Sequence, residues 1–390
     1  MLAFEKTEYM ARVNQTKEQM AAKGMDVLLV TDPANMCYLS GYDALSFYTP
    51  QAVVVSTQQD QPVWIGRFQD LVCAQETCWM DQGNFIAYPD YYLWEPTEKH
   101  VMDFVADFLK GKGLAGSVMG VEMDAYYFTA FWFERLKKDL PNAGFLDATL
   151  LVNRIRAVKS PQEIVYMKKA AAILEKGMQR AVDVINEGVR ECDAAAEIYH
   201  DLISGTASAG GDYPSLAPIM PSGKRTGGAH LTWTEEKYQK DQIVYVEFAG
   251  CYKRYHAPMA RTIYIGNPPP EIEETAKVVV EGLNMAMETA KPGATCEEIE
   301  RAWKSVITKY GIEKESRMGY DIGLSYPPVW MQHTMHMRPG DKSVLKPNMT
   351  FHLMPGVWRG DFGVAITESI RITENGCETL AAFPRKLFVK

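Results

Sequence analysis

Hydrophobic and polar positions follow two different patterns along the chain. Over the first 150 residues, an amphipathic stretch to about Lys23 is followed by the short apolar runs MDVLLVTD, QAVVVS and PVWIG. Such runs have the length and β-branched content of strands, whereas the opening stretch has helical periodicity. Alternating helical and strand patterns predict an α/β domain over residues 1–155.

A strong helix start marks the end of this first domain. Ser160 is followed by Pro161 and Glu163, which is the pattern of a capping box with proline at the first helical position. Apolar residues then recur at helical spacing: Ile164, Met167, Ala171, Leu174 and Met178. We therefore expect a long helix to about Ile185, and a second domain over residues 156–390.

The second domain mixes helical patterns with antiparallel strand patterns. PEIEETAKVVVEGLNMAMETA and CEEIERAWKSVITKYG read as helices that stop at Pro292 and Gly311. QIVYVEFAG and RTIYIG read as strands, and MTFHLM and VAITESIRIT read as the last two strands of the chain. This arrangement predicts an α+β domain.

Two carboxylates interrupt apolar strands of this domain. Strand alternation places Glu368 on the same face as Val364, Ile366, Ile370 and Ile372, and Glu247 interrupts the run IVYVEFAG. If Glu247 and Glu368 converge on one pocket, repulsion and desolvation raise one pKa and provide a proton donor or acceptor near neutral pH. The alternatives are a structural ion pair in the core for Glu368, or a solvent-facing sheet edge for either residue.

Histidines are the other candidates for proton transfer. His230 ends the Gly-rich segment PSGKRTGGAH, where loop backbone can hold a histidine that exchanges protons near neutral pH. His333 and His336 are three positions apart, which suits a helical face or a turn, but a metal site needs a further ligand pattern. The alternative for each is an exposed histidine without function. The sequence lacks GxSxG, HExxH and the common phosphate-binding loops, which argues against serine esterases, zincins and NTPases.

Composition narrows the class of protein further. Hydrophobic residues make up 47% and charged residues 23%, and no apolar run approaches eighteen residues, as expected for a soluble cytoplasmic protein. The seven cysteines are scattered without paired spacing, so we expect reduced thiols. The net charge of −8 and the absence of basic clusters argue against nucleic acid and membrane partners, and favour a small or cationic ligand.

The chain resembles the creatinase, prolidase and methionine-aminopeptidase family (M24) along nearly its whole length. The segments that carry the resemblance are MDVLLVTDPANMCYLSGY, RIRAVKSPQEIVYMKKAA, MPSGKRTGGAH, VEFAGCYKRYHAPMART, GYDIG, LKPNMTFHLMPG and AITESIRI. The resemblance implies an α/β N-terminal domain of the creatinase, ribonuclease-H-like type, and an α+β pita-bread catalytic domain. It also implies a homodimer in which the N-terminal domain helps to close the partner's site.

The resemblance also identifies the residues of this chain that stand at the positions of the family's metal ligands. Metal-dependent members use Asp, Asp, His, Glu and Glu, and the matching positions here are Glu247, Pro258, Tyr320, Met354 and Glu368. Proline and methionine cannot supply the hard oxygen ligands of a divalent ion. We therefore expect no metal and no other cofactor.

Loss of the metal favours a substrate whose carbon already carries positive charge, such as an amidine or a guanidine, because no Lewis acid is left to polarise a carbonyl. The sequence departs from creatinase at Thr49, where an arginine would bind the substrate carboxylate, and at Ala260, where creatinase has a catalytic glutamate. It is similar instead to the ectoine-utilisation hydrolases. That likeness implies a cyclic amidine substrate and a deacetylase that takes the product.

In this interpretation Glu247 attacks the amidinium carbon or activates the attacking water, and His230 carries a proton to the departing nitrogen. Glu368 would hold the amidinium nitrogens. The residues expected to bind the substrate are Phe47, Tyr320, Trp330, His333, His336 and Arg338.

Three other hypotheses are kept. The chain could be a creatinase-like enzyme that acts on another amidine or guanidine, or a non-catalytic binding module of the same fold. It could also be a metallopeptidase that uses His333, His336 and His352 as new ligands.

Overall fold

The computed structural model describes residues 2–390. Its contacts divide the chain into two compact units, the first ending at Arg156 and the second running from Ala157 to Lys390. None of the helices within residues 2–390 combines the length and the apolar character that crossing a bilayer requires.

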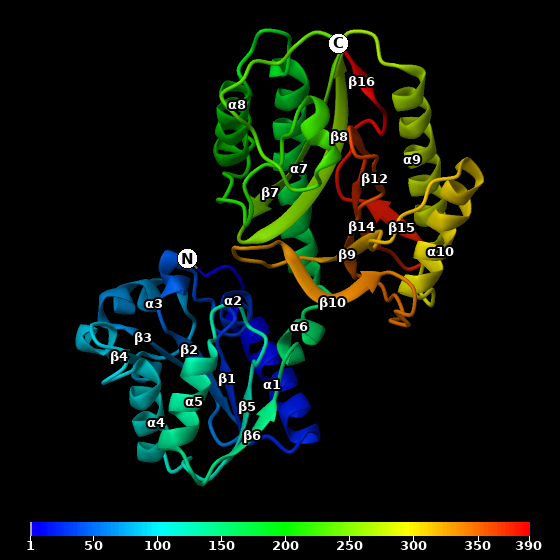
Figure 1. Cartoon of the computed structure of the whole chain (residues 1–390). Helices are drawn as coiled ribbons and strands as arrows, with labels where there is room; N and C mark the ends of the chain where they lie inside the picture. The colour runs from blue at the N-terminus through cyan, green and yellow to red at the C-terminus, as the bar shows by residue number, and fades with distance from the viewer. Residues whose placement is uncertain (1) are drawn as a thin grey trace. The chain divides into compact units, whose positions relative to one another are not determined.

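The first unit is built on one six-stranded sheet covered by helices (Figure 1). In chain order its strands are β1 (Val27–Val30), β2 (Ala52–Ser56), β3 (Val63–Arg67), β4 (Phe85–Tyr88), β5 (Val118–Val121) and β6 (Gly144–Asp147). Its helices are α1 (Lys6–Ala22), α2 (Pro33–Ser40), α3 (Leu71–Thr77), α4 (Val101–Gly111), α5 (Ala130–Asp139) and α6 (Leu151–Ile155). The spatial strand order is β4-β3-β2-β1-β5-β6.

This sheet is mixed, and its central strands β1 and β2 are buried on both faces. Strand β1 pairs antiparallel with β2 and parallel with β5. All four of its residues are apolar and completely buried, as expected for a central strand that helices cover on both sides. Val27 and Leu29 belong to the same core cluster as Val101 and Val105 of helix α4. The α/β prediction for this part of the chain is confirmed.

Four long helices surround the strands of the second unit, with α7 and α8 on one side and α9 and α10 on the other (Figure 1). They are α7 (Pro161–Val184), α8 (Glu191–Ser204), α9 (Pro270–Thr289) and α10 (Cys296–Ile307). Helix α7 starts at the predicted capping box: the Glu163 amide donates to the Ser160 hydroxyl, and the Ser160 amide donates to the Glu163 carboxylate at 2.8 Å.

The strands of the second unit form three sheets. A three-stranded sheet has the order β16-β8-β7, a five-stranded sheet the order β10-β9-β11-β14-β15, and β12 pairs with β13. Their bounds are β7 (Gln242–Tyr252), β8 (Tyr255–Ile265), β9 (Gly319–Ile322), β10 (Met331–Met337), β11 (Thr350–Leu353), β12 (Gly356–Trp358), β13 (Gly363–Ala365), β14 (Glu368–Ile372), β15 (Cys377–Thr379) and β16 (Phe388–Val389). The β7–β8 hairpin pairs eleven residues on each side, so it fixes Glu247 opposite Ala260.

The expectation of one last strand over VAITESIRIT is wrong. The chain leaves β13 after Ala365 and joins a different sheet at Glu368, and two further strands follow. Thr367 lies at this crossing point, where its amide donates to the Ala260 carbonyl at 3.1 Å. The residues on both faces of this segment are buried, so alternation did not separate a core face from a solvent face.

The segment QHTMHM is also not a helix or a simple turn. It lies in strand β10, whose register with β9 shifts between Met331 and His336. His333 has a φ of 65°, so the strand bulges there. The buried Asp321 carboxylate accepts the amides of Thr334 and Met335 next to the bulge.

Candidate active site

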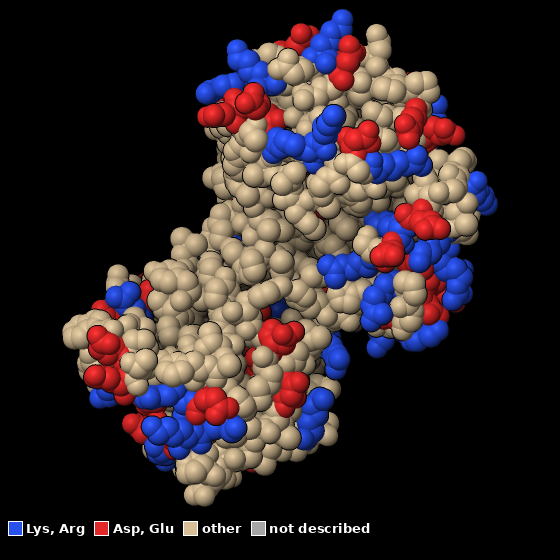
Figure 2. All heavy atoms as spheres, in the orientation of Figure 1, with Lys and Arg blue, Asp and Glu red and all other residues tan. Residues whose placement is uncertain are grey.

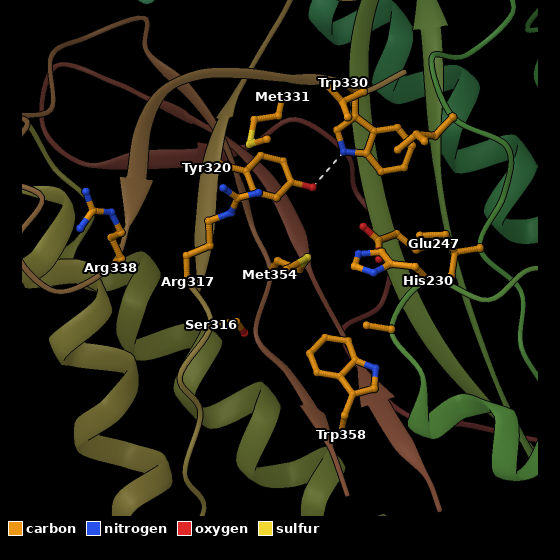
Figure 3. Close-up of a pocket in the computed structure, with 14 residues that line it drawn as sticks. His230, Glu247, Ser316, Arg317, Tyr320, Trp330, Met331, Arg338, Met354 and Trp358 are labelled. Carbon is orange, nitrogen blue, oxygen red and sulfur yellow. Dashed lines mark hydrogen bonds between the residues drawn. The ribbon is translucent and has the colours of Figure 1, made fainter. Parts of the chain in front are cut away.

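A cavity of about 550 Å³ opens in the second unit among the strands and the loops that connect them. Figure 3 shows the side chains that converge on it. Its charged and polar lining residues are His230, Glu247, Ser316, Arg317, Tyr320 and Arg338. Its apolar and aromatic lining residues are Leu216, Ile219, Ala229, Val329, Trp330, Met331, Met354 and Trp358. A mostly apolar wall with a few polar groups is typical of a small-molecule site.

Glu247 is the deepest charged group of this cavity, with only 5% of the residue exposed. Its backbone is fixed on both sides, since β7 pairs with β8 and the Glu247 amide and carbonyl also exchange hydrogen bonds with Ile219 at 2.8 Å. No hydrogen bond from another residue of the described chain reaches its carboxylate, and burial raises the pKa of Glu247 to about 7. The strand therefore fixes the position of the Glu247 backbone, and no group of residues 2–390 occupies the acceptor sites of the carboxylate.

Lys314 is the cation that acts on Glu247 from within the protein. Its ammonium donates to the carbonyls of Met354 and Gly356 at 3.0 Å each, and lies 5.0 Å from the centre of the Trp358 ring. Burial lowers the pKa of Lys314 to about 7, and Glu247 opposes that shift. Conversely, Lys314 counteracts the rise in the pKa of Glu247. Lys314 was missed in the sequence because it lies in a loop without periodic pattern.

Two arginines line the cavity, and they differ in their surroundings. The Arg317 guanidinium lies 5.0 Å from the centre of the Tyr320 ring, and its Nη1 donates to His336 Nδ1 at 3.1 Å. No carboxylate within residues 2–390 forms a salt bridge with Arg317. Arg338 is exposed, and its Nη1 donates to the carbonyl of Pro339. Figure 3 shows Arg317 beside Tyr320, with Arg338 further from Glu247.

Tyr320 and Trp330 form the polar and aromatic edge of the cavity. The Trp330 indole donates to the Tyr320 hydroxyl at 2.9 Å, and His352 Nδ1 lies 3.0 Å from the same oxygen. Burial raises the pKa of Tyr320, so its hydroxyl keeps its proton. His352 is completely buried, and that burial lowers its pKa to about 3.

Glu368 is placed differently from the expectation that both carboxylates face one pocket. It is not among the residues that line the cavity, and its Oε1 accepts from Arg261 Nη2 at 2.6 Å. The two side chains are 0% and 1% exposed. Arg261 donates hydrogen bonds from its other N–H groups to the carbonyls of Ala260, Thr367, Phe383 and Pro384. Glu368 therefore forms a structural ion pair in the core, which was the alternative interpretation of this residue.

The structure brings together His230, Glu247, Tyr320, Trp330 and Arg338 of the predicted site. His230 is exposed at the mouth, in the turn after residues 223–227. His333 and His336 lie in the bulged strand β10 and do not line the cavity, although His336 contacts Arg317. Phe47 belongs to the first unit, where its ring packs at 5.4 Å from that of Tyr127.

The fold defines a class: enzymes built from an α/β N-terminal unit and an α+β pita-bread unit. The chain belongs to metallopeptidase family M24. The model of that family matches residues 165–374, and the creatinase/prolidase N-terminal domain matches residues 12–158. The family resemblance and the fold class expected from the sequence are confirmed.

Individual relatives agree with this assignment. The chain is 46% identical over 396 residues to an ectoine hydrolase of Halomonas elongata, covering 100% of this chain and 99% of the relative. It is 25% identical over 380 residues to an Xaa-Pro dipeptidase of Pyrococcus horikoshii, covering 96% and 98%. A prolidase structure from Thermococcus sibiricus has a TM-score of 0.85 at 21% identity, covering 99% and 100%. The latter similarity bears on the fold alone.

The family's divalent metals can be tested against the residues present. Of the five matching positions, Pro258 has no side-chain donor, the Met354 thioether is soft, and the Glu368 carboxylate is held by Arg261. No group of three or more His, Cys, Asp or Glu side chains within residues 2–390 could hold a metal ion. His333, His336 and His352 thus form no such group. The donor set does not fit the family's metal centre.

Proposed function

We propose that this chain, without a metal, hydrolyses the cyclic amidine ring of ectoine to an N-acetyl-diaminobutyrate, and also that of hydroxyectoine to the corresponding hydroxylated product. The observation that carries the proposal is the buried Glu247 carboxylate, which accepts no hydrogen bond from residues 2–390 and lies in a cavity that Arg317 also lines. The full-length similarity to the ectoine hydrolase of Halomonas elongata supports the choice of substrate.

The charges of the cavity suit a substrate with a cationic and an anionic end. Ectoine carries an amidinium and a carboxylate. Figure 3 shows Glu247 and Arg317 approaching the cavity from different sides. We assign the amidinium to Glu247 and the carboxylate to Arg317, since a guanidinium binds a carboxylate through two parallel hydrogen bonds. Arg317 replaces Arg338 in this role because Arg338 is exposed and turned to a backbone carbonyl.

The amidinium carbon already carries positive charge, so it does not need a Lewis acid to accept a nucleophile. Glu247 either removes a proton from a water molecule that attacks this carbon, or attacks the carbon itself and forms a covalent intermediate that water then hydrolyses. In both routes the C–N bond of the ring breaks, and the oxygen of water stays on the former amidine carbon. His230, at the cavity mouth, delivers a proton to the departing nitrogen. Trp330 packs against the ring. Glu368 does not contact the substrate. Its ion pair with Arg261 holds the start of strand β14 in position.

The test is proton NMR of ectoine incubated with purified, chelator-treated protein. We expect the ring signals to disappear and those of an acetylated diaminobutyrate to appear at the same rate with and without chelator. Hydroxyectoine is tested in the same way. The matched control is Glu247→Gln, which keeps the shape of the side chain and removes its charge.

Three outcomes would contradict the proposal. An unchanged ectoine spectrum together with turnover of creatine would assign another amidine or guanidine substrate. Turnover of an Xaa-Pro dipeptide that requires added divalent metal would assign the peptidase activity. Tight ectoine binding without turnover would assign a binding module.

A further inference from the structure

A chain of buried polar groups runs behind Tyr320 to the backbone of strand β8. The Tyr320 hydroxyl lies 3.0 Å from His352 Nδ1, and His352 Nε2 lies 2.7 Å from the Thr367 hydroxyl. The Ala260 amide donates to that same hydroxyl at 2.7 Å. His352 and Thr367 are both 0% exposed, so water does not reach the links between them.

The direction of the hydrogen bonds follows from counting donors and acceptors. The Thr367 hydroxyl receives the Ala260 N–H, so its own hydrogen needs an acceptor. Within residues 2–390, the only other group in hydrogen-bond contact with this hydroxyl is His352 Nε2. Nε2 must therefore be unprotonated and accept, because the alternative leaves a buried hydroxyl hydrogen unpaired.

The same count then fixes Tyr320. With Nε2 unprotonated, His352 carries its hydrogen on Nδ1 and donates it to the Tyr320 oxygen. The Trp330 indole, which can only donate, gives that oxygen a second hydrogen bond at 2.9 Å. Tyr320 thus accepts twice, and its own hydrogen has no acceptor among these partners. Tyr320 lines the cavity, and that is where the hydrogen points.

We infer that Thr367 and His352 are positioning residues that turn the Tyr320 hydroxyl into a dedicated hydrogen-bond donor of the cavity. This role deepens the proposed function and rests on it. When the amidine carbon is attacked, electron density moves onto the substrate atoms bonded to it. A fixed O–H that two N–H groups already polarise stabilises that density without reorganisation. Tyr320 occupies the position where metal-dependent relatives have a histidine ligand, so part of the electrophilic assistance passes to this hydroxyl.

The first test is kinetic and uses ectoine. Tyr320→Phe removes the donor and is expected to lower kcat roughly 100-fold, with a smaller change in KM. Thr367→Val keeps the shape and removes the hydroxyl, and is expected to lower kcat roughly 10-fold. Thr367→Ser should restore most of the loss. Thr350→Val is the matched control. Thr350 is also buried in this unit, but it donates to the Ile322 carbonyl and is not part of the relay, the hydrogen-bonded chain of Tyr320, His352 and Thr367.

The double variant separates the relay from a structural effect. Because Thr367 acts only through the Tyr320 hydroxyl, Thr367→Val should not lower kcat further when Tyr320→Phe is already present. If the two losses multiply instead, or if Thr350→Val lowers kcat as much as Thr367→Val, the inference is wrong. Thermal unfolding of every variant shows whether each comparison uses folded protein.

The second test does not depend on the substrate. In ¹⁵N-histidine-labelled protein, with His352 assigned by its loss in His352→Gln, we expect a neutral ring that is protonated on Nδ1 and not on Nε2. A ring protonated on Nε2 would overturn the relay, whatever the enzyme acts on. If wild-type protein leaves ectoine unchanged but shows the expected tautomer, the proposed function fails and the orientation of Tyr320 stands.

Discussion

Two glutamate–arginine combinations in the second unit use the same chemistry in opposite ways. Glu368 and Arg261 contact each other at 2.6 Å, and both are sealed from solvent. Glu247 and Arg317 both line the cavity, yet neither is joined to the other or to another opposite charge by a salt bridge within residues 2–390. The first pair is closed and the second is open.

The difference shows which buried charge belongs to the fold and which to the function. Arg261 has a partner for each of its N–H groups, so the closed pair has nothing left to offer a ligand except one oxygen of Glu368. Neither member of the open pair has a salt-bridge partner within residues 2–390, so a zwitterionic ligand would offset part of the unfavourable free energy of desolvation. The face of the molecule that Figure 2 shows gives no such signal, since acidic and basic side chains are intermingled on it.

Neutralising the open carboxylate has the largest expected effect. Glu247→Gln should lower kcat/KM for ectoine at least about 10³-fold, because it removes the nucleophile or base. It should also stabilise the fold by about 3 kcal/mol near pH 8. Glu247 has a folded-state pKa raised to about 7, so it favours the folded state only when protonated. That contribution is lost as pH rises from the ordinary glutamate pKa through about 7.

Steady-state kinetics and urea unfolding at acid and alkaline pH measure these two effects. The gain in the free energy of unfolding should be absent near pH 4, where the carboxyl is protonated in both states. Near-wild-type turnover of Glu247→Gln would show that the open pair is not the reacting one.

Removing the carboxylate of the closed pair should destabilise the fold, whereas removing that of the open pair should stabilise it. Glu368→Ala leaves the Arg261 charge buried without its carboxylate, and should lower the free energy of unfolding by about 3 to 5 kcal/mol. Arg261→Met together with Glu368→Leu removes both charges and should recover much of that loss. Urea unfolding of the three proteins provides the measurement. If Glu368→Ala keeps wild-type stability but loses turnover, Glu368 acts on the substrate.

The two pairs also show which contacts can be predicted from the sequence and which cannot. The capping box at Ser160 was predicted because its hydrogen bonds span three residues, and Glu247 was found because a charge stands out in an apolar run. The partner of Glu368 lies 107 positions away, so no local pattern revealed it. Lys314 and Arg317 were missed for a related reason, since Lys314 contacts carbonyls 40 and 42 positions away and Arg317 contacts a histidine 19 positions away.

Removing the open arginine should affect binding more than turnover. Arg317→Gln deletes the proposed carboxylate anchor, so KM for ectoine should rise roughly 10- to 100-fold while kcat changes little. Arg338→Gln is the matched control: it removes an exposed arginine that also lines the cavity, and should change KM less than about 2-fold. A larger effect at Arg338 than at Arg317 would return the anchor to the residue first expected from the sequence.

The smallest effect concerns the pH at which the open carboxylate ionises. Because Glu247 must be ionised to react, kcat/KM should fall as pH drops below about 7. The Lys314 ammonium favours the ionised form, so Lys314→Met should raise the pKa of Glu247 and move this acid limb to higher pH. Lys304→Gln, which removes a surface lysine paired with Glu300, should leave the limb in place. An acid limb that Lys314→Met does not move would show that this cation does not act on the reacting carboxylate.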